Sequence, residues 1–227
     1  MIVDLVIPAL NESLSLPSVL ADLDRRLVRD VIVVDNGSTD GTSAVAASLG
    51  CIVVFEPRRG YGSACLAGLA RLAASSPRAD VVAFLDADHS DFPGELRHLI
   101  APIAGGSSDL VIGSRTLGSA EPGALLPQQR LGNALAAFLI RRLYGATVTD
   151  LGPFRAIRRE ALDALGMVDR DYGWTAEMQV KALKQGWRYA EVPVSYRRRK
   201  GRSKIAGTVR GTIGAGVKIL YTVFRYA

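Results

Sequence analysis

Apolar and polar residues follow one another in a strand–helix pattern along the first part of the chain. Short apolar runs end in polar turns, and each turn leads into a segment whose leucines recur at helical spacing, as after Pro17. The apolar runs are Ile2–Pro8, Val31–Val34, Cys51–Phe55 and Val81–Leu85. Strands that alternate with helices in this way predict an α/β fold with a doubly wound, parallel sheet.

The strand predicted at Val81–Leu85 ends in three carboxylates, Asp86, Asp88 and Asp91. Ligands of open α/β sheets bind beyond the carboxyl ends of the strands. Asp86 and Asp88 are two residues apart, which in extended backbone directs both side chains to one side. We therefore expect them to bind Mg²⁺ or Mn²⁺ together with a nucleotide diphosphate. The alternative is a polar loop in which Asp88 or Ser90 caps the next helix.

The turn after the first strand excludes two common nucleotide-binding folds. A dinucleotide-binding unit has GxGxxG at this place and a P-loop protein has GxxxxGK[ST]. Here the residues are PALNE, from Pro8 to Glu12. The phosphates of a nucleotide would need other partners, which agrees with a metal ion held by the paired carboxylates.

Composition favours one globular domain. The chain has 227 residues, of which 48% are hydrophobic and 22% charged. Its two cysteines, Cys51 and Cys65, lie in apolar segments without CxxC or histidine neighbours, which favours reduced core residues in a cytoplasmic protein. The first residues do not resemble a signal peptide, and no apolar run reaches the 18 or so residues of a transmembrane helix.

Positive charge is concentrated near the C-terminus. The net charge is +6, and residues 197–204 contain six Lys or Arg without interleaved aromatic residues, which favours an anionic surface over nucleic acid. From residue 205 apolar positions recur every three or four residues, so we expect a basic amphipathic helix over 204–227 that binds an anionic membrane surface. The alternatives are packing on this chain's own sheet or on a second subunit, in a homodimer.

Seven segments resemble, in order, the signatures of family 2 inverting glycosyltransferases with the GT-A fold. They are VIPALNE (6–12), VVDNGSTDGT (33–42), RGYGSACLAG (59–68), LDADHSD (85–91), IGSR (112–115), TDLGPFRAI (149–157) and GRSKI (201–205). The last two resemble the branch typified by dolichyl-phosphate mannosyltransferase. The resemblance implies a single GT-A domain at 1–203, with a Rossmann-like, mostly parallel sheet flanked by helices. Its nucleotide-sugar half would be 1–115 and its acceptor half 116–203, followed by the C-terminal helix at 204–227.

The resemblance also implies roles for individual residues. Asp86 and Asp88 match the metal-binding DxD motif, with Asp88 the surer ligand and a catalytic residue. The implied donor-binding residues are Pro8, Ala9, Asn11, Glu12, Asp35, Gly62, Asp86 and Ala87. Those implied to face the acceptor phosphate or the donor diphosphate are Arg115, Arg130, Asp150, Arg202, Ser203 and Lys204. His89 and Ser90 replace the Leu-Gln common in the family, which leaves the third metal ligand open.

The expected reaction moves one sugar, with inversion, from a nucleotide-sugar of the GDP-mannose or UDP-glucose type to a polyprenyl or dolichyl phosphate. The enzyme would be cytoplasmic and bound peripherally to the inner face of the membrane. A lipid phosphate is already anionic, whereas a saccharide or small-molecule hydroxyl would need a general base, for which Glu177 is the candidate. Glu177 has an alternative as a solvated acid on a helix. A sugar-phosphate nucleotidyltransferase is a further alternative, disfavoured by PALNE.

Overall fold

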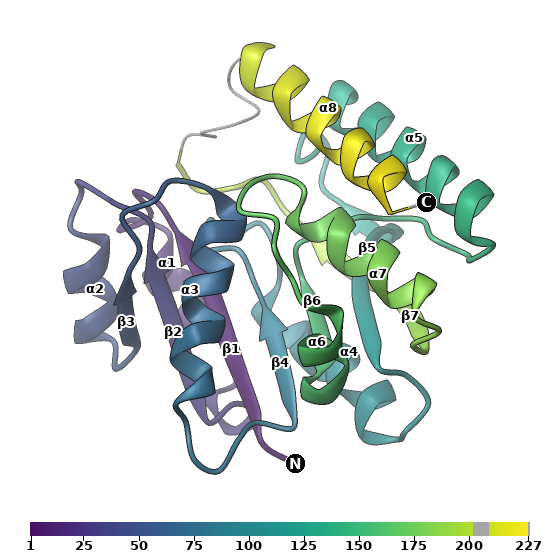
Figure 1. Ribbon diagram of the computed structural model, residues 1–227. Coiled ribbons are helices and arrows are strands. Elements are labelled where there is room, and N and C mark those ends of the chain that lie inside the picture. The colour runs from purple at the N-terminus through teal and green to yellow at the C-terminus, as the bar shows by residue number, and fades with distance from the viewer. Residues whose placement is uncertain (202–208, 227) are drawn as a thin grey trace.

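A seven-stranded sheet crosses the molecule in the order β3-β2-β1-β4-β6-β5-β7 (Figure 1). The structure is a computed structural model and describes residues 1–201 and 209–226. The strands are β1 Val3–Ala9, β2 Asp30–Asp35, β3 Ile52–Phe55, β4 Val81–Phe84, β5 Leu110–Ala120, β6 Arg155–Arg158 and β7 Tyr189–Tyr196. The four strands expected from the apolar runs are confirmed to within one residue at every end, and the α/β class with a mostly parallel sheet is confirmed.

One strand runs against the rest of the described sheet. The short strand β6 pairs antiparallel with both β4 and β5, whereas the other pairs are parallel. The predicted mostly parallel sheet is confirmed, but the sequence did not reveal which strand is antiparallel, because an apolar pattern indicates burial and carries no information on strand direction. Since β5 and β7 share the direction of β1, the carboxyl ends of all strands except β6 meet at one edge.

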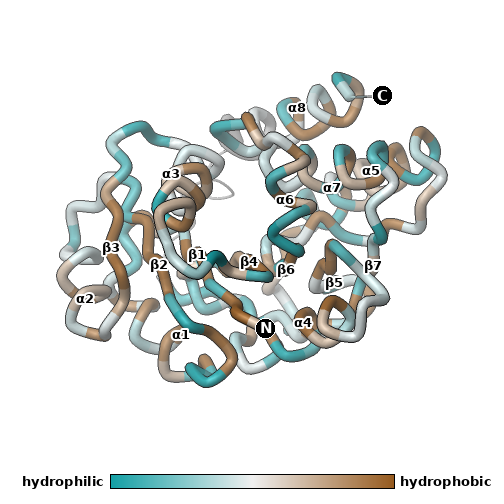
Figure 2. The backbone as a smooth tube through the Cα atoms, turned by 60° about the horizontal axis from the view of Figure 1, so that its bottom comes forward, coloured by the Kyte–Doolittle hydropathy of each residue, from teal (hydrophilic) through white to brown (hydrophobic). Residues whose placement is uncertain are grey.

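Helices cover both faces of the sheet. They are α1 Leu16–Asp22, α2 Thr42–Ser48, α3 Tyr61–Ala73, α4 Leu96–Ala104, α5 Pro127–Tyr144, α6 Arg159–Leu165, α7 Trp174–Lys184 and α8 Val209–Arg225, with 3-10 turns at Arg25–Leu27 and Pro93–Glu95. Side chains of β1 alternate between the faces: Leu5 and Ile7 pack with α1 and α4, and Val6 packs with α3 and α7. The inner strand β2 is accordingly apolar between its two terminal aspartates, as its brown colour shows (Figure 2).

A third cluster joins α5, α7 and α8 beside the sheet. Val223 of α8 is fully buried with Ala137 and Ile140 of α5 and Val180 of α7. The C-terminal part of α8 thus packs on this chain's own helices, whereas the alternative considered above was packing on its sheet or on a second subunit. None of the helices in the described part of the chain has the length and apolarity needed to span a bilayer. The boundary expected between 203 and 204 lies outside the described residues.

Asp109 directly precedes β5, at the edge of the sheet opposite the carboxyl ends, and hydrogen bonds connect it to residues at the ends of β6 and β7. Its carboxylate accepts hydrogen bonds from Nε and the backbone N–H of Arg188, at 2.8 and 3.1 Å, and from Nε of Arg158 at 3.1 Å. Hydrogen bonds from Arg188 lower the pKa of Asp109 from 3.8 to about 2, although partial burial opposes the shift. The charged form is therefore favoured in the folded protein.

Replacing Asp109 with Asn should lower the free energy of unfolding by about 2 kcal/mol at neutral pH, because charged hydrogen bonds to two guanidinium groups are lost. Urea denaturation measures this. A carboxyl whose pKa is lower in the folded than in the unfolded state stabilises the fold at pH values above the unfolded-state pKa. This contribution is lost as the pH falls through the folded-state pKa. The difference in free energy of unfolding between the wild type and Asp109→Asn should accordingly become smaller as the pH falls from 3.8 to about 2.

The matched control is Asp163→Asn, because the Asp163 side chain is 42% exposed in its pair with Arg78. This substitution should lower the free energy of unfolding by less than about 1 kcal/mol. An equal loss of unfolding free energy in both variants would contradict this role of Asp109. So would a loss in Asp109→Asn that does not change with pH.

Candidate active site

A cavity of about 370 Å³ opens at the carboxyl edge of the sheet. The ends of β1 and β4, the start of α3 and residues 171–172 before α7 form its walls. Six of the residues expected to bind donor or metal line this cavity: Pro8, Ala9, Glu12, Asp86, Ala87 and Asp88. Residues far apart in sequence are therefore brought together as the motifs implied.

The other three expected donor-binding residues are not among those that line the cavity, and two of them shape the polar turn beside it. Asn11, at φ 52°, accepts a hydrogen bond from the backbone N–H of Thr39 at 2.8 Å. Asp35 accepts one from the N–H of Ser38 at 2.7 Å and another from the Ser43 hydroxyl. Burial would raise the pKa of Asp35, but these hydrogen bonds lower it. Gly62, in the first turn of α3, lies where the chain before α7 approaches closely.

Asp86 and Asp88 form the negative side of the cavity. One Asp86 oxygen is excluded from solvent and has no hydrogen-bond partner among the described residues. Burial, together with the charge of Asp88, raises the pKa of Asp86 to about 7. Asp88 accepts a hydrogen bond from the backbone N–H of Ser90 at 2.9 Å, so the Ser90 backbone fixes its orientation.

This pair suits a hard divalent cation. An unpartnered carboxylate oxygen beside a second carboxylate matches the oxygen ligands that Mg²⁺ and Mn²⁺ prefer. Residues 1–201 and 209–226 contain no cluster of three or more His, Cys, Asp or Glu able to hold a metal. His89 instead places its Nε2 2.9 Å from Asp22. A metal here would therefore need further ligands from a bound diphosphate or water.

Asp91 does not belong to the pair. Its side chain is buried, both its oxygens lack a described hydrogen-bond partner, and it lines neither cavity. Burial and the charges of Asp86 and Asp88 raise the pKa of Asp91 well above its usual value. Both effects shift the equilibrium of Asp91 toward its neutral form.

Arg199 supplies positive charge to the cavity. It follows β7, and its guanidinium lies 3.0 Å from Glu12 and 3.4 Å from Asp88. In the sequence this arginine belongs to the C-terminal basic run, and its part in the site was not predicted. The available signal was the position of that run, directly after a strand whose carboxyl end reaches the same edge.

A second cavity of about 750 Å³ lies between the end of β5, α5 and α8. Three of the predicted acceptor residues, Arg115, Arg130 and Asp150, line it. The Arg115 guanidinium holds Asp150 through two hydrogen bonds of 2.6 and 2.8 Å, and this carboxylate raises the pKa of Arg115 against the effect of burial. Arg130 is exposed. The remaining predicted residues of this group, Arg202, Ser203 and Lys204, lie outside the described residues.

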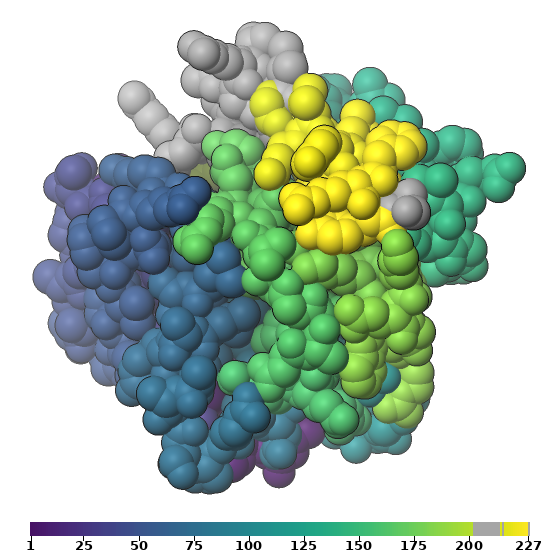
Figure 3. Space-filling model, in the orientation of Figure 1, coloured from purple at the N-terminus to yellow at the C-terminus, as the bar shows by residue number. Residues whose placement is uncertain are grey.

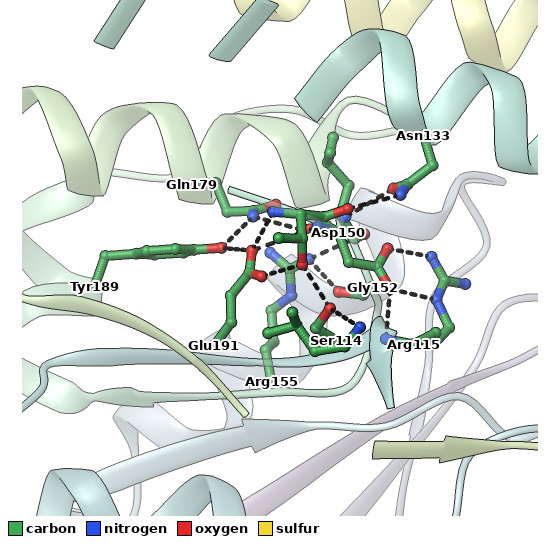
Figure 4. A network of polar contacts seen from close by, with 12 residues as sticks. Ser114, Arg115, Asn133, Asp150, Gly152, Arg155, Gln179, Tyr189 and Glu191 are labelled. Carbon is green, nitrogen blue, oxygen red and sulfur yellow. Dashed lines mark hydrogen bonds and ion pairs between the residues drawn. The ribbon is translucent and has the colours of Figure 1, made fainter. Parts of the chain in front are cut away.

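A polar network fixes the backbone that carries Asp150 (Figure 4). Asn133 of α5 donates to the Thr149 carbonyl at 3.1 Å and accepts from the Leu151 N–H at 2.9 Å. Gln179 of α7 donates to the Asp150 carbonyl at 2.9 Å, and Glu191 of β7 accepts from the Thr149 N–H at 2.8 Å. Sequence reasoning missed these partners, because they come from three separate elements and carry no motif of their own.

Glu177, the candidate general base, is fully buried and lines neither cavity. Its carboxylate accepts hydrogen bonds from the N–H groups of Val168 and Asp169 and forms an ion pair of 2.7 Å with Lys181. The geometry gives this side chain a structural role and offers no support for proton abstraction from an acceptor.

Known proteins are similar to this chain in sequence and in fold. Residues 4–166 match the model of glycosyl transferase family 2. An uncharacterized glycosyltransferase of Mycobacterium tuberculosis is 44% identical over 215 residues, 93% of each chain. An undecaprenyl-phosphate mannosyltransferase of Micrococcus luteus is 32% identical over 91% of this chain and 88% of its own length.

A solved structure matches the architecture. Glucosyl-3-phosphoglycerate synthase of Mycobacterium tuberculosis, crystallised with Mn²⁺, UDP-glucose and phosphoglyceric acid, aligns with a TM-score of 0.77 and 24% identity, covering 99% of this chain and 79% of its own. At that identity the likeness bears on the fold alone. The family match and the curated relatives go further: this chain is a glycosyltransferase and belongs to glycosyl transferase family 2.

Proposed function

We propose that this glycosyltransferase moves one hexose, with inversion, from a nucleotide-sugar to a polyprenyl phosphate at a membrane surface, with the help of Mg²⁺ or Mn²⁺. The observation that carries the proposal is the pairing of two cavities, one with metal-binding carboxylates and one lined by arginines and apolar side chains. Arg115, which lines the second cavity, also carries one of the positive charges that lower the pKa of Asp86 in the first.

The first cavity is the proposed donor site. Asp86 and Asp88 would hold the metal, which when bound would stabilise negative charge on the departing diphosphate. Arg199 lies beside Asp88 and would add a positive charge on the same side. Glucosyl-3-phosphoglycerate synthase, which shares the fold, was crystallised with Mn²⁺ and UDP-glucose, ligands of the class proposed for this cavity.

The second cavity is the proposed acceptor site. Arg115 and Arg130 would bind an anionic headgroup, while Leu125, Ala137 and Ile219 give the wall an apolar part that suits an isoprenoid chain. A phosphate oxygen of the acceptor would attack the anomeric carbon, and the bond to the diphosphate would break on the opposite side. Because that oxygen is anionic near neutral pH, no general base is needed. The undecaprenyl-phosphate mannosyltransferase relative supports this acceptor class.

The rival reaction, transfer to a hydroxyl, has less support from the geometry. It needs a base at the acceptor, and the carboxylate of Glu177 is occupied by backbone amides and Lys181 outside both cavities.

The surface of α5 and α8 is the proposed membrane contact. The two helices pack side by side, and their exposed faces carry apolar residues at helical spacing: Leu131, Leu135 and Phe138 on α5, and Val217, Tyr221 and Phe224 on α8. Arg142 and Arg225 are exposed on the same helices. Apolar residues with basic neighbours complement an anionic bilayer, and the acceptor cavity opens between these helices.

Asp88→Asn should reduce sugar transfer to background, because a neutral amide binds a divalent cation poorly. Release of nucleoside diphosphate measures turnover, and a chelator should have the same effect on the wild-type protein. Asp80→Asn, an exposed carboxylate at the other end of the same strand, should leave turnover unchanged. Wild-type turnover by Asp88→Asn in the presence of chelator would refute the metal site.

Arg130→Ala should raise the KM for polyprenyl phosphate about tenfold, since a charge-assisted contact to phosphate is lost. Nucleotide affinity, measured by calorimetry, should not change. Arg71→Ala, in the last turn of α3 and outside both cavities, is the control. An equal loss of nucleotide affinity in Arg130→Ala would remove the acceptor assignment.

Phe138→Ser should weaken sedimentation with anionic vesicles roughly tenfold, because burial of this side chain, 54% exposed in the free protein, would be lost. Phe55→Ser, on the edge strand β3 and 64% exposed, should bind vesicles like the wild type. If Phe138→Ser instead changes the oligomeric state and not vesicle binding, a second subunit covers this face and the membrane proposal fails.

A further inference from the structure

Residues 168–173, here called the α7 approach loop, form one wall of the donor cavity. Asp171 and Tyr172 line the cavity directly. The loop lies tightly on the start of α3, where the Arg170 carbonyl accepts hydrogen bonds from the N–H and the hydroxyl of Ser63, at 2.9 and 3.1 Å. The position of this loop therefore sets the distance between two walls of the cavity.

Two glycines show how close this contact is. A Cβ atom at Gly60 would lie 2.1 Å from the Arg170 carbonyl oxygen, and one at Gly62 would lie 2.1 Å from that of Asp169. Gly60 also has φ of +138°, a conformation that side chains disfavour. The motif RGYG thus has a physical reason in this chain, because the approach loop occupies the space that side chains would need.

The opposite side of the loop is held by α8. Lys218 forms an ion pair of 2.9 Å with Asp169, whose other oxygen accepts a hydrogen bond from the Asp171 N–H at 2.8 Å. Asp169 thereby connects a helix on the surface with a residue that lines the donor cavity. The Asp169 side chain is buried, so water screens this pair less than it would an exposed one.

A second connection runs through Glu177. Its carboxylate accepts the N–H groups of Val168 and Asp169, at 3.1 and 2.7 Å, and also the Tyr226 hydroxyl at 3.0 Å. Thr222 adds close packing, since a Cβ at Gly173 would lie 2.5 Å from its hydroxyl oxygen. Figure 3 shows the yellow atoms of α8 directly against the green atoms of the segment that leads into α7.

We infer that Lys218 and Tyr226 are positioning residues for the donor site: α8 holds the α7 approach loop against α3 and so sets the shape of the cavity that binds the nucleotide-sugar. The inference rests on the proposed function, because it takes this cavity as the donor site. It also means that the helix proposed to contact the membrane takes part in donor binding, at a site separate from the acceptor cavity.

The test compares Lys218→Met with the wild-type full-length chain. Amide hydrogen exchange of the peptide covering 168–173 should become faster. The Kd for UDP or GDP with Mn²⁺, whichever the wild type binds, should rise about fivefold, and Lys218→Arg should restore most of the affinity. Arg78→Met breaks another ion pair, with Asp163, away from the loop and should change neither quantity.

A double-mutant cycle separates a direct contact from a general loss of stability. Asp169→Asn should weaken nucleotide binding to a similar extent, and adding Lys218→Met to it should have little further effect. Additive effects, or unchanged exchange and unchanged Kd in Lys218→Met, would overturn the inference. Failure of the wild type to bind either nucleotide would contradict the proposed donor site, whereas the exchange comparison would still test the link between α8 and the loop.

Discussion

Negative charge at the end of β4 is the constraint around which this structure is arranged. Asp86 and Asp88 stand close together with limited access to water, which raises the pKa of Asp86. Carboxylates that are kept charged in such a place need cations nearby. Arg199 comes from the segment after β7 and Arg115 from β5, so strands distant in sequence share the compensation. A divalent ion with a diphosphate would balance the same negative charge, which supports the proposal that the nucleotide-sugar binds at this edge.

Much of this could be predicted from the sequence, for identifiable reasons. Buried parallel strands are apolar on both faces, and a carboxylate pair that follows one of them directly, as Asp86 and Asp88 follow Val81–Phe84, marks the binding edge. The direction of β6 could not be predicted, because four residues of a buried strand look alike in either direction. Nor could the network around Asp150, since Asn133 and Glu191 acquire their roles only through tertiary contacts. Glu177 illustrates the opposite case: the sequence offered it as the base that a hydroxyl acceptor would need, but its carboxylate holds the α7 approach loop.

The acceptor side and the surface helices follow from the same architecture. Because α5 and α8 pack beside the sheet at its carboxyl edge, a cavity with basic and apolar walls opens between them, and it is the proposed acceptor site. The outward faces of both helices carry exposed apolar side chains, as the proposed membrane contact requires. The contact between Lys218 and Asp169 extends this arrangement to the proposed donor site. The proposed membrane contact, acceptor site and donor site are thus neighbouring parts of one packed unit.

The most direct test of the account is transfer of radiolabelled sugar from a panel of nucleotide-sugars, with Mn²⁺ or Mg²⁺, to three acceptors offered separately. These are polyprenyl phosphate in anionic vesicles, a soluble phosphorylated hydroxy acid and a simple saccharide. The account predicts label in the lipid fraction alone, lost when the metal is chelated. Label in the hydroxy acid or the saccharide, with none in the lipid, would contradict it and transfer the chemistry to a hydroxyl acceptor.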